Sequence, residues 1–359
     1  AGPEDLDPDF TPAPAPGDLL ATIEATPGSK SFGELISTSP TGTKGSEPHH
    51  MGLSADGQTL ATGGLHSFLD PRPLPDIYLW DLADPLLPAL KKAFVGKEGA
   101  GTDAFVPLPG GGFLTTLMTN RAGLASGRLG RIDAAGTTLE EFAPPDDQSP
   151  EGYNPHGIAF SAKYDRLVTV DFVALASLVL PGDAPQFRQT VRIHKLSTLE
   201  MLQTIELPAA FALMDVTSLA HTKGLFLTSN GFGKFFIVDA LALSVSEKAV
   251  YQLAPGNVPG HCLFQTLQGG KKVLIVSYAL NQLRLVDMTK PYSVKQLQVY
   301  DIKVRDIDKG YTSAAGPHFV TVDKDERTIA VSNYFVQNPA TIVNAANYPA
   351  DKTIRFFSL

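Results

Sequence analysis

The sequence contains almost no cysteine: Cys262 is the only one among its 359 residues. A single thiol excludes an internal disulfide and a cysteine-rich metal site, and it leaves the redox compartment undecided. The chain also lacks an apolar run approaching the roughly 18 residues that a membrane-spanning helix needs, so we expect no membrane span. Hydrophobic residues still make up 43% of the chain, which is enough for a large core.

Positive charge is also scarce. Lys and Arg number 29 against 37 Asp and Glu, which gives a net charge of -8, and no basic run is present. Such a chain repels a phosphate backbone on average, so we expect no nucleic-acid partner. No segment keeps a helical hydrophobic period long enough to predict a helical domain.

Glycine and proline are abundant by contrast, with 32 and 28 residues spread along the chain. This composition is typical of many short strands joined by turns. Four segments share one pattern of strand, polar turn, apolar strand, loop and alternating strand, and they begin EPHH at 47, NPHG at 154, VPGHC at 258 and GPHF at 316. Two weaker copies begin DAFV at 103 and LMDV at 213. The copies recur about every 54 residues, a period that indicates propeller blades.

This repeat predicts an all-β fold, a β-propeller with six blades by strand count, although seven remain possible. The chain stops at the third strand of the last repeat. We therefore expect a strand from the N-terminal region, 18–26 or 31–39, to complete that blade and remove an exposed edge. Residues 18–359 are predicted to form a single domain, preceded by a Pro-rich spacer at 1–17.

The N-terminal sequence suggests export. The chain opens AGPEDLDPDFTPAPAPGD, an acidic, Pro-rich stretch without an initiator Met. This is typical of a mature end left after removal of a signal peptide, followed by an extended spacer. The alternative is an arbitrary boundary of the sequence. We expect a periplasmic or secreted protein.

Histidines recur at one position of the repeat. In a propeller the first strand of each blade lines the central channel, so equivalent positions on these strands converge on one small volume. Neighbours on one strand point to opposite faces, so the ligands of one ion would come from different blades. Aligned, the positions are His49 with His50, Asp103, His156, Asp215 beside Met214, His261 and His318.

Four histidine-bearing blades predict a metal site formed by His49, His50, His156, His261 and His318. Neutral imidazoles suit copper, zinc, iron and nickel, and a four-histidine site without a thiolate fits copper or iron best and magnesium or calcium worst. The alternative is that these histidines bind carbonyls and waters in a wet channel. Asp103 and Asp215 lie on the same register and are the predicted catalytic bases.

Other candidates are weaker. His66, His194 and His221 lie off the register and are predicted at the surface or in turns, although His66 could reach the channel mouth. Cys262 fits a small buried hydrophobe better than a redox thiol. The glycines at 110–112 sit in a turn without the helix that a phosphate cradle requires.

Several segments, in order along most of the chain, resemble the selenium-binding protein and methanethiol oxidase family. EPHHMGLS sits where that family has its paired histidines, and DIYLWDLADPLLPAL is similar to its following strand and proline-rich turn. The remaining similar segments are DLLATIEATPGSKSFGELIS, TVRIHKLSTLEMLQTIEL, KVLIVSYALNQLRLVDMTKP and AGPHFVTVDKDERTIAVSNYF.

The resemblance implies a β-propeller. It also implies, for the oxidase members, a copper enzyme that converts methanethiol, oxygen and water to formaldehyde, hydrogen sulfide and hydrogen peroxide. By motif only His49 and His50 carry over as copper ligands. The family's cysteine segment is replaced by MGLSADGQ, its histidine-rich second inner strand reads TDAFVPL, and its glutamine in the last inner strand is His318. These departures allow a rearranged ligand set and a different substrate.

The leading functional hypothesis is a copper-dependent oxidase acting on a small substrate, possibly a thiol, at the multi-histidine site. Iron or zinc are the alternative metals. A propeller lactonase or isomerase, a four-His iron oxygenase, and a non-enzymatic metal-binding or protein-binding scaffold remain open as alternatives.

Overall fold

The computed structural model describes residues 17–143, 152–180, 184–207, 212–255, 263–277, 280–302, 317–333 and 354–359. It divides into two compact units, Ala1–Tyr153 and Asn154–Leu359. Strands dominate both units. Helices are limited to α1 (Leu175–Val179) and two short 3-10 turns in the described part of the chain. None of the described helices is long and apolar enough to cross a membrane.

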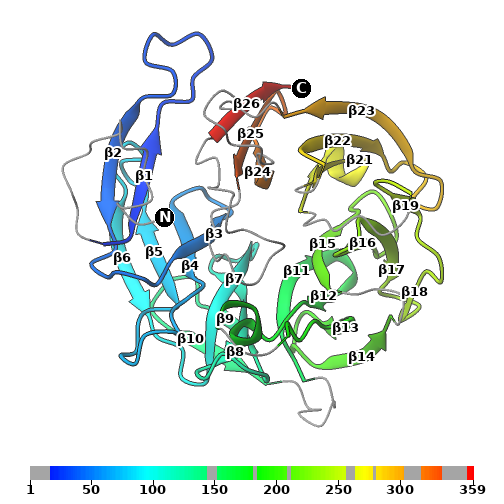
Figure 1. Cartoon of the computed structure of the whole chain (residues 1–359), viewed down its shortest axis with the longest axis horizontal. Helices are drawn as coiled ribbons and strands as arrows, with labels where there is room; N and C mark the ends of the chain where they lie inside the picture. The colour runs from blue at the N-terminus through cyan, green and yellow to red at the C-terminus, as the bar shows by residue number, and fades with distance from the viewer. Residues whose placement is uncertain are drawn as a thin grey trace. The chain divides into compact units, whose positions relative to one another are not determined.

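The first unit holds a two-stranded sheet and two four-stranded blades. The two-stranded sheet pairs β1 (Leu19–Ile23) with β2 (Leu35–Pro40). Blade 1 consists of β3 (Pro48–Leu53), β4 (Thr59–Gly64), β5 (Ile77–Asp81) and β6 (Ala89–Phe94). Blade 2 consists of β7 (Gly99–Pro107), β8 (Phe113–Asn120), β9 (Arg128–Ile132) and β10 (Leu139–Phe142). In both blades the strands pair in chain order (Figure 1).

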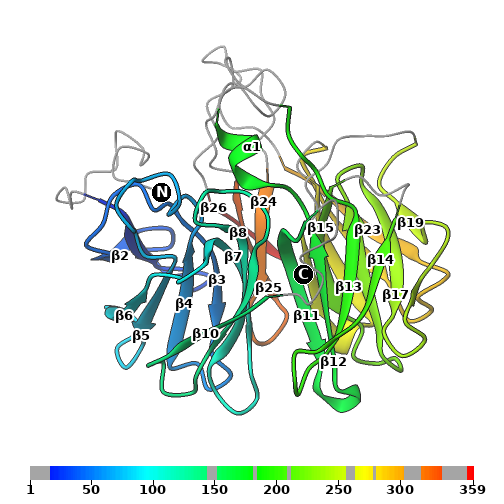
Figure 2. The same cartoon turned by 90° about the horizontal axis from the view of Figure 1, so that it is seen from below.

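The second unit holds four blades. Blade 3 consists of β11 (Pro155–Ser161), β12 (Arg166–Asp171), β13 (Thr190–Lys195) and β14 (Met201–Glu206), and Figure 2 shows α1 beyond one end of these strands. Blade 4 consists of β15 (Leu213–Ser218), β16 (Leu225–Asn230), β17 (Lys234–Asp239), β18 (Ser244–Val245) and β19 (Tyr251–Gln252). Blade 5 consists of β20 (Phe264–Leu267), β21 (Lys272–Ser277), β22 (Gln282–Asp287) and β23 (Lys295–Asp301). Blade 6 consists of β24 (Pro317–Val322), β25 (Thr328–Asn333) and β26 (Ile354–Ser358).

Six antiparallel meander sheets of this kind define an all-β, six-bladed β-propeller, as the repeat predicts. Within each unit the core lies in apolar layers between consecutive blades. One layer packs Val168 and Ile193 of blade 3 against Phe226 and Val238 of blade 4. Middle strands are buried on both faces and therefore read as apolar runs, whereas outer strands such as β6 and β23 are mostly exposed and polar.

The predicted closure of the last blade is wrong. Strands β1 and β2 pair with each other in a separate sheet, and blade 6 has three strands in the part of the chain that the structure describes. The hairpin is held within the first unit: Ser37 Oγ donates to the carbonyl of Leu86 at 2.5 Å, and Ser39 Oγ donates to that of Pro88. The predicted spacer falls almost entirely on residues 1–16, outside the described residues, and the single-domain boundary stays a prediction.

One irregularity recurs on the inner strands. In each of β3, β7, β11, β15 and β24 the pairing with the next strand shifts by a residue, so an extra residue bulges out of the ladder. A bulge bends the strand and re-aims its side chains, and bulges are frequent beside active sites. The shifts fall between His49 and Met51, Thr102 and Phe105, Pro155 and Ile158, Leu213 and Val216, and Pro317 and Val320. Every predicted register residue of the described inner strands therefore sits at a bulge.

Candidate metal centre

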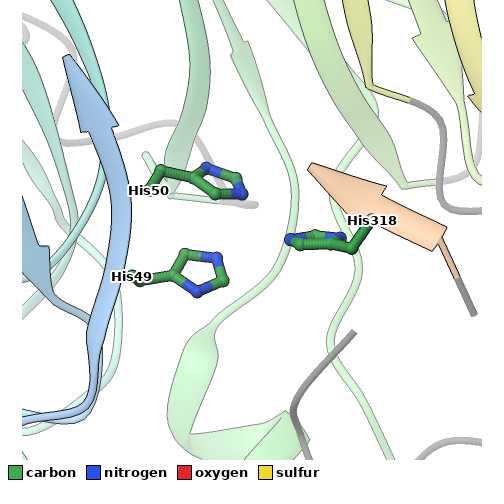
Figure 3. Close-up of side chains that lie close together, drawn as sticks. All are labelled: His49, His50 and His318. Carbon is green, nitrogen blue, oxygen red and sulfur yellow. The ribbon is translucent and has the colours of Figure 1, made fainter. Parts of the chain in front are cut away.

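Strand β3 presents two histidines on the same side. In a regular strand, His49 and His50 would face opposite ways. Here His49 pairs with Gly63 and Met51 pairs with Thr62, so His50 is the extra residue of the bulge. The two rings consequently stack, with centroids 4.0 Å apart and planes at 23° (Figure 3). The bulge makes one strand the source of two neighbouring imidazoles.

Asp103 of β7 lies against this pair. Its carboxylate Oδ1 is 3.4 Å from Nε2 of His49 and 3.2 Å from Nδ1 of His50, and the Asp103 side chain is 1% exposed. The approach depends on Gly63: a Cβ there would lie 2.5 Å from the carbonyl oxygen of Thr102. Any larger residue at 63 would push β7 away, so the glycine brings the carboxylate within reach of both rings.

The segment that leads into β3 is fixed by buried polar contacts. Asp18 Oδ2 accepts hydrogen bonds from the N–H of Ser46 at 2.8 Å and from its hydroxyl at 2.7 Å. The hydroxyl of Tyr78 donates to Ser46 Oγ at 2.7 Å, and burial raises the pKa of Tyr78. One residue further on, the Glu47 carboxylate contacts Nδ1 of His66. These contacts hold the start of the histidine strand in place.

Blade 3 holds its histidine differently. His156 is buried at the β11 bulge and packs edge-on against the Phe172 ring, with centroids 5.0 Å apart. The start of β11 is tied to Asp171, whose carboxylate accepts the N–H of Asn154 at 3.2 Å. Asp171 Oδ2 also receives Nε–H of Arg192 at 2.9 Å, and both side chains are fully buried. Burial raises the pKa of Asp171, and the Arg192 charge opposes that rise.

Asp215 occupies the equivalent bulge of blade 4, but its carboxylate faces backbone donors. Oδ1 accepts the N–H of Val216 at 2.8 Å, and Oδ2 accepts the N–H of Phe264 at 3.1 Å. Because Phe264 belongs to β20, this carboxylate links blade 4 to blade 5. The backbone of Asp215 also packs so closely on Gly157 that a Cβ there would lie 2.7 Å from the Asp215 Cα. Its predicted role as a base stays a prediction.

The remaining register residues are placed as follows. His318 is buried at the β24 bulge, and Figure 3 shows its ring projecting from that strand. His261 lies outside the described residues, as does Cys262. The structure thus brings together His49, His50 and Asp103 within the first unit, and the assignment of all five histidines to one metal stays a prediction.

One off-register prediction is wrong. His194 is not at the surface but 2% exposed on β13, a middle strand covered on both faces by blade packing, with Nε2 3.4 Å from Oγ1 of Thr169. The Asp171–Arg192 pair was missed altogether. Its only sequence signal is an aspartate closing an apolar strand, and that position usually indicates a turn.

No family model matches the chain. The fold and the histidine pair define the class of protein: a six-bladed β-propeller with imidazoles gathered at the bulge of an inner strand. The chain is distantly related to the methanethiol oxidase and selenium-binding protein family. It is 36% identical over 109 residues to a methanethiol oxidase from Ruegeria pomeroyi, a match that spans 29% of this chain and 23% of the relative.

Solved structures agree on the fold. A hypothetical selenium-binding protein from Sulfolobus tokodaii aligns with a TM-score of 0.68 at 14% identity, covering 89% of this chain and 79% of that one. The hydrazine synthase of Kuenenia stuttgartiensis aligns with a TM-score of 0.62 at 12% identity, covering 95% and 89%. At these identities the likeness establishes the propeller alone.

The residues at the β3 bulge fit a transition-metal ion. Two imidazoles lie side by side, and a buried carboxylate oxygen lies 3.2 and 3.4 Å from a nitrogen of each ring. Imidazole donors suit copper, iron and zinc, and a carboxylate beside a ligating imidazole is the usual outer support. The chemistry of the donors is therefore compatible with copper, iron or zinc.

Proposed function

We propose that His49, His50 and His318 hold one metal ion. The support is that the three side chains are buried and that each lies at the bulge of an inner strand, at the position that the repeat aligns. Three imidazoles from two strands leave further coordination positions open for a substrate, as catalytic sites require. His156 is not a member of this three-residue group.

We further propose that the ion is copper and that the protein oxidises a small thiol with oxygen. The distant relation to a methanethiol oxidase and the paired histidines at the matching motif support this. For methanethiol, the balanced reaction takes one molecule each of methanethiol, dioxygen and water to one molecule each of formaldehyde, hydrogen sulfide and hydrogen peroxide. When bound, the metal would supply a Lewis acid for the thiolate and a path for electrons to oxygen.

The chain's own residues have narrower tasks in this proposal. The bulge of β3 brings both imidazoles to the same side of the strand, so their ring nitrogens lie close together before an ion arrives. Burial excludes water from the three rings, which strengthens every electrostatic interaction among them. Asp103 stands at the side of the pair, where it holds the rings.

The first experiment measures metal content. Protein purified without added metal, loaded with Cu(II) and freed of excess, should retain about one equivalent per chain by elemental analysis. The His318→Ala variant should lose that metal, whereas His221→Ala, a histidine in a turn of the second unit, should retain it. Less than about a tenth of an equivalent in the wild type after loading would contradict the metal centre.

The second experiment measures turnover. The copper-loaded protein should consume oxygen in the presence of methanethiol and release hydrogen sulfide, formaldehyde and peroxide in equal amounts. A protein that binds copper but turns over none of a panel of small thiols would contradict the oxidase assignment. That result would favour a metal-binding protein without thiol oxidase activity.

A further inference from the structure

Asp103 has a property that its register position does not explain. Its buried carboxylate meets two imidazoles through two chemically different nitrogens, Nε2 of His49 and Nδ1 of His50. A neutral imidazole carries one N–H and one lone pair, and the hydrogen bond made by one nitrogen decides which nitrogen carries the hydrogen. A carboxylate beside one nitrogen therefore leaves the lone pair on the other.

We propose that Asp103 is the positioning residue of the histidine pair, and that it sets opposite tautomers on the two rings. His49 then carries its hydrogen on Nε2 and presents Nδ1 to the metal, while His50 carries its hydrogen on Nδ1 and presents Nε2. This inference rests on the proposed metal centre. It assigns Asp103 to holding the ligands rather than to taking a proton from substrate.

The argument comes from geometry and burial. At 1% exposure the Asp103 side chain has little access to water, and the ring nitrogens of His50 and His49 lie within ion-pair distance of Oδ1, at 3.2 and 3.4 Å. The rings stack at 4.0 Å, so one carboxylate oxygen reaches both. Ligating histidines commonly give their other N–H to a carboxylate, which fixes ring orientation and raises ligand basicity.

The first test needs neither metal nor a variant. Nitrogen chemical shifts of the metal-free, 15N-histidine-labelled full chain report the tautomer of each ring, with His49→Gln and His50→Gln used to assign the signals. We expect Nε2–H on His49 and Nδ1–H on His50. The Nδ1–H form is the minor tautomer of a free histidine side chain, so it is diagnostic. Finding His50 as Nε2–H would overturn the proposal even if the protein binds copper.

The second test uses metal affinity. In Asp103→Asn the carboxylate charge is lost and an NH2 donor replaces one oxygen, so we expect the affinity for Cu(II), measured by chelator competition, to fall about 10- to 100-fold. The stoichiometry at saturation and the nitrogen couplings in the EPR spectrum should not change. An unchanged affinity would overturn the proposal. Loss of an oxygen ligand from the copper spectrum would overturn it too, because Asp103 would then be a direct ligand.

The chain offers a matched control at the same bulge of another blade. Asp215→Asn removes a carboxylate whose oxygens accept the N–H groups of Val216 and Phe264. We expect it to leave the tautomers of His49 and His50 and the Cu(II) affinity unchanged. Equal losses in both variants would show that any charge change at a bulge disturbs the site, and would overturn the specific role of Asp103. If the wild-type protein binds no copper, the proposed metal centre is contradicted. The tautomers measured in the metal-free protein still test the role of Asp103.

Discussion

Two pairs of neighbouring blades, blades 1 and 2 and blades 3 and 4, share the same bulge on their inner strands. The side chains at these bulges have different contacts in the two pairs. In each pair the first blade bulges at a histidine and the second at an aspartate. In the first pair, the Asp103 carboxylate faces His49 and His50. In the second pair, the Asp215 carboxylate is occupied by two backbone N–H groups, and His156 packs on Phe172. The bulge alone does not bring a carboxylate to a histidine pair, because the partners of the aspartate differ between the two pairs of blades.

The largest expected contrast lies between the histidines of the two pairs. The double variant His49→Ala/His50→Ala should lose bound copper completely, because two of three proposed ligands are gone. His156→Ala should keep its copper, since His156 lies outside the three-histidine group. Elemental analysis after identical loading measures both. If His156→Ala also loses its copper, the two pairs of blades do not differ in this respect. The result would then favour the metal site predicted from the repeat, with histidines from several blades.

The next contrast concerns how each histidine strand is anchored. In the second pair the start of β11 depends on the Asp171–Arg192 ion pair, in which both side chains are fully buried. Replacing Arg192 with Met leaves an uncompensated buried carboxylate, and breaking such pairs costs about 3–5 kcal/mol. We expect Arg192→Met to lower the free energy of unfolding, measured by chemical denaturation, by this amount. The matched variant Arg131→Met, which removes an exposed pair with Glu140, should cost less than about 1 kcal/mol. Equal effects would mean that the buried pair contributes little.

In the first pair, the corresponding anchor is a hydrogen-bond network around Ser46. Asp18→Ala removes the acceptor of both Ser46 hydrogen bonds and leaves a buried N–H without it, which costs about 1–3 kcal/mol. We expect a smaller loss than for Arg192→Met, again by chemical denaturation, because no charge is stranded. A larger loss than in Arg192→Met would reverse the order of the two anchors.

The fold was predictable from the sequence, but the site only in outline. Pro48, Pro155 and Pro317 mark strand starts locally, so the repeat places the inner strands and the blade count. The bulge at His50 depends on register with β4, which no local pattern specifies. Side-chain alternation therefore predicted opposite faces for His49 and His50, and the structure puts them on one.

Distant contacts explain the other differences. A strand from 18–26 or 31–39 was predicted to close blade 6, but β1 and β2 pair with each other, and Asp18 before them bonds to Ser46 of the first unit. His194 was predicted near the surface because it lies off the register, yet middle strands of a propeller are covered on both faces. The pairing of Asp103 with two rings likewise requires β7 to pack against β3, an approach that Gly63 permits and that sequence position alone does not reveal.

The smallest expected effect extends the comparison to a turn. Asp133, between β9 and β10, accepts hydrogen bonds from the Thr137 hydroxyl and the N–H groups of Thr137 and Thr138, with the hydroxyl contributing most, and these lower its pKa to about 2. A carboxyl group whose folded pKa is depressed stabilises the fold above its unfolded pKa, and this contribution is lost as pH falls through the folded value. Stability attributable to Asp133 should therefore be complete above about pH 4 and decline toward pH 2.

Because Asp133 lies in a surface turn, where solvent screens its charge, the effect should be small. Asp133→Asn should flatten the acid side of the stability curve slightly, as followed by thermal unfolding between pH 2 and pH 6. An acid limb identical to the wild type would show that these turn contacts persist in the unfolded chain or contribute nothing.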